Sequence, residues 1–173
     1  MGYAPRAVDP IVDLAPGTED SPLVPYFARR IRSAVQVPKL ARSFFALKAA
    51  VFAVDFDSGD AVTLRFDHGR LTLHAGTIGT PAVTFGGPLR ALLSLHHLRP
   101  RDLAKALIGR IPAKNTFSRE DRASSPPPSM RGRVDAADLV YLFAKKELRV
   151  YGLLSHPRTV YRFISLLGAG EEV

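Results

Sequence analysis

The acidic run DFDSGD, from Asp55 to Asp60, is the segment whose residue types most resemble a metal site. Carboxylate oxygens are the ligands that Ca²⁺ prefers, and calcium loops space them in the pattern D-x-[DN]-x-[DN]-G. That pattern needs glycine at the sixth position, whereas here Gly59 is fifth, Asp60 is sixth, and no glutamate follows at the required distance. The segment therefore predicts the turn of a β-hairpin rather than a calcium site.

The histidines and serines do not form a catalytic pattern either. His96 and His97 are neighbours, so on a helix their rings would point about 100° apart and would not easily share a metal ion. The segment HAGTIGT lacks the lysine of a phosphate-binding loop, and there is no G-x-S-x-G turn. A catalytic cluster would need His74 to meet Asp67 or Asp55 in space. The chain has no cysteine, which excludes thiol nucleophiles and thiolate metal sites. We therefore expect a protein that is not an enzyme and that has no cofactor and no metal ion.

The chain carries a net charge of +8, and its basic residues are clustered. Residues 21–50 contain no acid, and residues 99–133 contain nine Lys or Arg against three acids. Such clusters favour anionic partners, namely phosphate backbones, lipid head groups or acidic proteins, although they also occur as plain solvated faces. Nucleic acid is the weaker prediction, because the aromatic residues of the predicted sheet lie among aliphatic residues rather than among Lys and Arg. We expect contact with an anionic membrane from the six cations of the first cluster: Arg29, Arg30, Arg32, Lys39, Arg42 and Lys48.

The length of 173 residues and the apolar fraction of 46% predict one globular domain with a substantial core. No run of 18 apolar residues and no secretory signal is found, so a cytoplasmic location with peripheral membrane contact is the simplest expectation. Residues 1–22 are rich in Pro, Asp and Gly and are expected to form a flexible arm. Residues 23–49 predict two basic amphipathic helices, separated at Pro38, that either lie on a membrane surface or pack on their own domain.

The period of the apolar residues changes to two after residue 50, which predicts β-strands. Strands are expected at 51–56, 61–66, around 71–73 and at 82–85, and the turns DSGD, DHGR and GTIGTP join them into an antiparallel meander. In the first strand Phe52, Val54 and Phe56 share one side, and we expect that apolar side to be covered.

We expect helices to cover the apolar side of the sheet. We expect helices at 88–97 and 101–108, a flexible surface loop at 112–132, and a helix after Asp135 that bears Leu142 and Phe143 on its buried face. A last strand at 148–151 leads into a final helix that Ser155 caps. The predicted fold class is α+β, with a mostly antiparallel sheet of about five strands covered by helices.

The order of these segments from Phe52 onward resembles the sterol carrier protein type 2 domain family. The resemblance rests on DHGRLTL, on the strand PAVTF running into PLRALLSL, and on ELRVYGLLSHPRTVYRFISLL, and it covers about residues 50–168. The stretch 99–133 is longer than this compact family needs. The segment VPKLARSFFALKAA is also similar to the bacterial accessory proteins of ubiquinone synthesis that carry this domain.

The resemblance implies that residues 50–173 enclose an apolar tunnel between sheet and helices. Family members bind sterols, fatty acyl chains or other lipids without catalysis, and the local similarity adds an isoprenoid quinone intermediate as ligand and a biosynthetic protein as partner. The alternative is that the same apolar residues form an ordinary packed core. The chain would then be a protein-interaction module, or an accessory factor of isoprenoid quinone synthesis, without a ligand cavity of its own. The residues expected to line the tunnel are Phe52, Val54, Phe66, Leu93, Phe143, Phe163, Ile164 and Leu167.

Overall fold

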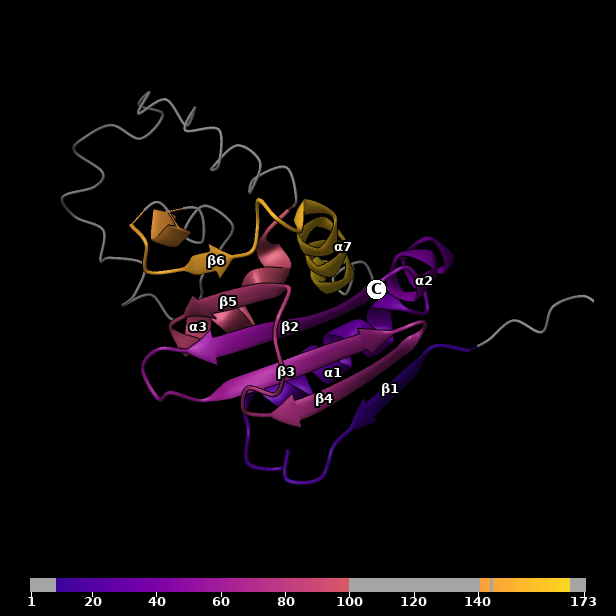
Figure 1. Cartoon of the computed structure of the whole chain (residues 1–173), viewed down its shortest axis with the longest axis horizontal. Coiled ribbons are helices and arrows are strands. Elements are labelled where there is room, and N and C mark those ends of the chain that lie inside the picture. The colour runs from indigo at the N-terminus through magenta and orange to yellow at the C-terminus, as the bar shows by residue number, and fades with distance from the viewer. Residues whose placement is uncertain (1–8, 100–140, 144, 169–173) are drawn as a thin grey trace, which may run out of the picture.

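A computed structural model describes residues 9–99, 141–143 and 145–168 of the chain, and its centre is a six-stranded mixed sheet (Figure 1). The strand order across the sheet is β1-β4-β3-β2-β5-β6. The α+β prediction is therefore confirmed. The strands are β1 (Ile11–Leu14), β2 (Lys48–Asp55), β3 (Ala61–Asp67), β4 (Arg70–Ala75), β5 (Val83–Gly87) and β6 (Arg149–Tyr151).

The helices pack against the sheet and against one another. Helix α1 contacts β1, β3, β4, α3 and α7, and α2 contacts α7. The expected helix at 101–108 and the expected loop at 112–132 lie outside the described residues, as does most of the helix expected after Asp135. The described helices are α1 (Leu23–Ala34), α2 (Pro38–Phe45), α3 (Leu89–Leu93), the short 3₁₀ helix η1 (Leu95–His97) and α7 (Pro157–Gly168).

Proline separates the first two helices, as the sequence predicts. Helix α1 ends at Ala34, and Val37 adopts an extended conformation with φ −87° and ψ 117° before Pro38 opens α2. A residue before proline is pushed out of the helical region, and proline itself is tolerated in a first helical turn because the missing N–H would have no partner there. Both helices are amphipathic, and α1 buries Phe27 and Ile31.

The meander is confirmed for β2, β3 and β4 but is wrong for β5. Strand β5 pairs in parallel with β2, and β3 pairs antiparallel with both β2 and β4. Residues 76–82 pass from β4 back across the sheet: the Thr63 hydroxyl donates to the Gly76 carbonyl at 2.8 Å, and the Ala82 N–H donates to the Ala50 carbonyl at 2.9 Å. This connection is too long for a tight hairpin. It crosses β3 and β2, and β5 then joins the far side of β2 in the same direction as β2.

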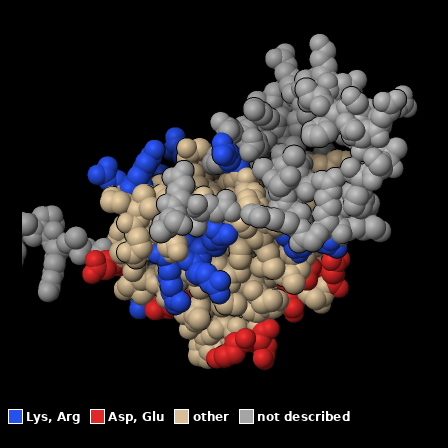
Figure 2. Space-filling view, turned by 180° about the vertical axis from the view of Figure 1, so that it is seen from behind, with Lys and Arg blue, Asp and Glu red and all other residues tan. Residues whose placement is uncertain are grey.

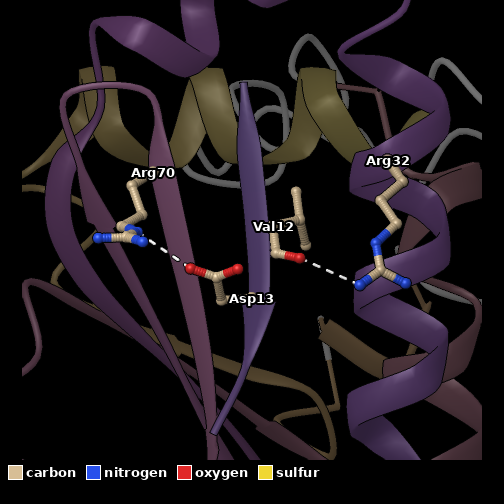
Figure 3. Close-up of polar contacts among 4 residues, drawn as sticks. All are labelled: Val12, Asp13, Arg32 and Arg70. Atoms are coloured by element: carbon tan, nitrogen blue, oxygen red, sulfur yellow. Dashed lines mark hydrogen bonds and ion pairs between the residues drawn. The ribbon is translucent and has the colours of Figure 1, made fainter. Parts of the chain in front are cut away.

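Residues 11–14, which we expected in the flexible arm, instead form the edge strand β1. Its Ile11 N–H donates to the carbonyl of Gly69 at 2.9 Å, beside the parallel ladder with β4. Two arginines hold this strand (Figure 3): Arg70 Nε lies 3.0 Å from Asp13 Oδ2, and Arg32 donates from α1 to the Val12 carbonyl at 3.0 Å. Four residues are too few to show a period of two, so only the partner strand identifies this segment as β-structure.

The register decides which side of the sheet meets the helices. Val51 pairs with Leu64 and Ala53 pairs with Val62, and all four belong to the buried core. We call this helix-covered side the core face and the opposite side the outer face. Side chains alternate along a strand and paired residues share a face, so Phe52 lies on the outer face. The expectation that Phe52, Val54 and Phe56 form the covered side is therefore wrong. The β2 side chains that face the helices are shifted by one position and include Val51 and Ala53.

Candidate functional site

Helix α7 contributes one apolar stripe to the buried core, and Phe163 of this stripe contacts the core face of the sheet. Its five buried side chains are Val160, Phe163, Ile164, Leu166 and Leu167. They recur every three or four residues, which is the spacing of one helix face. A polar link from its outer side runs to α2: Arg162 donates to the carbonyl of Ala46 at 2.9 Å, just beyond the last turn of that helix.

Phe163 is the centre of an aromatic cluster that joins this stripe to the sheet and to α1. Its side chain is fully buried, and its ring centroid lies 5.2 Å from that of Phe85, 6.0 Å from that of Phe27 and 6.2 Å from that of Phe66. Aromatic pairs are in contact at centroid distances of about 4.5–7 Å. The helix layer and the sheet layer therefore meet directly at Phe163.

Six of the eight residues expected to line a tunnel belong to this one core. Phe66, Phe163, Ile164 and Leu167 are buried members of it, and Leu93 and Phe143 are partly buried and pack against it. Sequence reasoning did not select Phe27 and Phe85 as part of the site. Phe27 lies in the predicted helical region 23–49 and Phe85 in the predicted strand 82–85, but only the pairing of Phe85 with Ala53 across β5 and β2 directs its side chain toward α7.

Phe52 and Val54 do not join the other six, because they lie on the outer face. Phe52 pairs there with Thr63, whose hydroxyl accepts a hydrogen bond from the Ile78 N–H at 2.9 Å. Val54 lines a separate pocket of about 380 Å³ at the β2–β3 turn, together with Asp20 and Asp60. The eight residues therefore divide between the two faces of the sheet and do not surround a single space.

The cationic side chains gather on the side of the molecule where the helices lie. Figure 2 views the molecule from behind, and Lys and Arg cluster over the middle and upper left of that face, with Asp and Glu nearer its rim. Of the six cations expected at a membrane, Arg29, Lys39 and Arg42 are exposed on α1 and α2, and Arg30 is half-buried. Lys48 is exposed too, but it begins β2 and shares the outer face with Phe52. Arg32 is the exception, because its guanidinium is bound to β1 (Figure 3).

A surface pocket of about 500 Å³ opens beside this cationic surface, and we call it the α1 pocket. Its walls combine apolar side chains with two guanidinium groups and two hydroxyl groups. Tyr26 also hydrogen-bonds His96 Nδ1 at 3.0 Å, which links α1 to η1 at this point. The lining residues are Pro22, Pro25, Tyr26, Arg29, Arg30, Ser33 and Leu93.

The residues that could have formed a catalytic cluster lie apart. Asp55 accepts hydrogen bonds from the Asp57 N–H at 3.1 Å and from the Ser58 hydroxyl at 2.7 Å, so it closes the β2–β3 turn as the hairpin prediction requires. His74 pairs with Thr63 and is therefore on the outer face, opposite to Asp55. Asp67 pairs with Arg70 at the other end of the β3–β4 ladder. Among the described residues no three potential metal ligands come together, and no described helix is both long and apolar enough to cross a membrane.

The fold is similar to that of a solved structure described as "UbiJ-SCP2 Ubiquinone synthesis protein". The match has a TM-score of 0.53 and 13% identity over 86% of this chain and 95% of the other. A crystal structure of sterol carrier protein 2 (TM-score 0.39, 10% identity, 84% and 95% coverage) and a conserved hypothetical protein from Thermus thermophilus (0.37, 10%, 83% and 85%) match less well. No protein-family model matches the chain, and no curated protein sequence matches it significantly. The chain thus shares the sterol carrier protein 2-type fold of the first of these structures.

Proposed function

We propose that this protein binds an apolar lipid between α7 and the core face of the sheet and carries it without converting it. The observation that carries the proposal is the stripe of five buried apolar side chains on α7, the last described element, whose Phe163 contacts the core face of the sheet. The fold it shares with a protein described as a ubiquinone synthesis protein supports an isoprenoid or quinone intermediate as ligand, beside sterols and fatty acyl chains.

Because Phe163 fills the space between the two layers, a lipid has to displace it. Burying a phenylalanine side chain is worth about 1.5–3 kcal/mol, and each buried methylene about 0.8 kcal/mol. A tail of about ten methylenes therefore gains roughly 8 kcal/mol gross, from which the ordering of tail and side chains is subtracted. A long acyl or prenyl tail offsets the loss of the Phe163 contacts, whereas a short one does not. The proposed ligand class is accordingly long-chain.

The cationic helix side is the proposed membrane-contact surface. Arg29, Arg30, Lys39 and Arg42 extend from it, and the chain has no acid between residues 21 and 50. A juxtamembrane Lys or Arg contributes about 1 kcal/mol of attraction to an anionic leaflet. Several such residues would hold the protein at a membrane reversibly, as loading and delivery of a lipid require.

The closed aromatic cluster supports a second candidate, a protein-interaction module or an accessory factor of quinone synthesis without a ligand cavity. The three ring contacts of Phe163 are those of a solid core. The two functions differ in whether the purified protein contains lipid.

Native mass spectrometry followed by organic extraction distinguishes them. A carrier is expected to show a bound species that is released as lipid into the organic phase. An extract that contains no lipid, combined with no binding of an added long-chain fatty acid, would leave the interaction module as the better description.

A further inference from the structure

We propose that the α1 pocket is a binding site for a phosphomonoester group. The pocket lies on the exposed side of α1, whereas Phe27, the member of the aromatic cluster on this helix, is on its buried side and touches only the Tyr26 wall of the pocket. It is therefore a different site from the proposed lipid site, although Leu93 of α3 closes one of its walls and also packs on the core.

The spacing along α1 explains how the helix builds this pocket. Tyr26 and Ser33 are each three or four residues from both Arg29 and Arg30, so the four side chains follow one stripe along the helix. The opposite stripe of α1 is buried in the core, which fixes the rotation of the helix. The two guanidinium groups are consequently held beside the same space.

The two arginines have no polar partner among the residues that the structure describes. Within the described part of the chain, neither Arg29 nor Arg30 makes a hydrogen bond or an ion pair, and the same is true of the Ser33 hydroxyl. Arg32, two positions beyond Arg30 on α1, shows the contrast, because its guanidinium binds the Val12 carbonyl. Two adjacent guanidinium groups without a counter-charge repel each other, and an anion between them removes that repulsion.

A phosphomonoester matches the chemistry of these walls. Guanidinium groups present forked N–H donors that fit phosphate oxygens in pairs, and two of them balance a dianion. The Ser33 hydroxyl adds a neutral donor. The volume of about 500 Å³ exceeds that of a phosphate alone, and Tyr26 and Leu93 offer apolar contact to the organic part of the ester. The group can belong to a lipid such as a phosphatidate or to a soluble phosphate ester.

This proposal rests on the proposed lipid-carrier function in one respect only, which is that a carried lipid could supply the phosphate group. The test uses the full-length ¹⁵N-labelled protein, titrated at constant ionic strength with inorganic phosphate, with soluble short-chain phosphatidate and with the matching phosphatidylglycerol. The pocket variant is Arg29→Gln with Arg30→Gln. The control variant is Arg65→Gln with Arg158→Gln, which removes the same charge from exposed positions of β3 and α7.

Saturable shifts of the Tyr26 and Ser33 amide signals with phosphate or phosphatidate are expected. The pocket variant should bind about tenfold or more weakly, because charge-assisted hydrogen bonds are lost, and the control variant should bind as the wild type does. Binding of phosphatidate alone would identify a lipid as the source, and binding of phosphate as well would include soluble esters.

Three results would overturn the site. They are the absence of saturable shifts, equal affinity for phosphatidylglycerol, which carries a diester, and equal weakening in the control variant. The lipid-carrier function fails in a different measurement, the organic extract of the purified protein, so the two failures can be told apart.

Discussion

Replacing Phe163 by alanine tests whether a lipid enters where the two apolar layers meet. In the wild type a ligand has to displace a fully buried ring with three aromatic neighbours. Displacement costs about 1.5–3 kcal/mol of burial, and each aromatic pair adds about 0.5–1.5 kcal/mol. If Phe163→Ala removes only the burial cost, the Kd for a long-chain ligand falls about tenfold to a hundredfold, since each factor of ten corresponds to about 1.4 kcal/mol.

The same substitution weakens the folded state. Phe→Ala in a core typically costs about 3–5 kcal/mol, out of a total stability of about 5–15 kcal/mol. Phe163→Leu, which retains more of the volume, is the variant to use if the alanine form does not fold. The assay is a fluorescence titration with a pyrene-labelled long-chain fatty acid, and thermal unfolding is recorded for every variant.

Phe44→Ala is the matched control. Phe44 is also buried, and its ring contacts Phe45 and Phe66, with no ring contact to Phe163 among the described residues. The control should lose a similar amount of stability while its Kd stays close to that of the wild type. An unchanged Kd in Phe163→Ala, or an equal gain of affinity in the control, would refute the idea that this ring occupies the lipid site.

Three further predictions concern the surface and the backbone. Lys39→Gln with Arg42→Gln should reduce co-sedimentation with anionic vesicles but not with neutral ones. If the wild type binds both kinds of vesicle equally, the cationic helix side is not a membrane-contact surface. Gly69→Ala should lower the melting temperature far more than Gly59→Ala. Both glycines have positive φ, but only at Gly69 would a Cβ collide with an aromatic ring of α2, and equal losses would contradict this packing. Arg32→Ala should reduce the free energy of unfolding by about 1 kcal/mol in denaturant titrations, because the β1 carbonyl loses its donor; no change would show that this bond does not stabilise the edge strand.

Local periodicity in the sequence was sufficient for the type and place of most elements. The stripe of α7, the break at Pro38 and the strands β2 to β6 all follow from patterns within a dozen residues. The DHGR turn is a clear case: His68 and Gly69 have φ values of 45° and 90°, and a two-residue hairpin turn with positive φ at both positions favours glycine. These features depend on neighbours in the chain, which the sequence displays directly.

The tertiary structure decided the pairing and therefore the site. The sequence pattern favoured Phe52 over Val51 for the core because Phe52, Val54 and Phe56 are the more apolar set, but the ladder with β3 turns Val51 inward. On the outer face the Phe56 ring instead packs against Gly86, where a side chain would leave it no room.

The tertiary structure, rather than the sequence pattern, also decided the place of β1 and the formation of the α1 pocket. A four-residue strand is recognisable only beside β4, and the sequence shows Arg29, Arg30 and Arg32 as equivalent cations. Only the fold binds Arg32 to the sheet edge and leaves Arg29 and Arg30 beside an open space. Periodicity is set by consecutive residues, whereas register, parallel pairing and the partners of a charge depend on residues far apart in the chain, and folding alone brings those together.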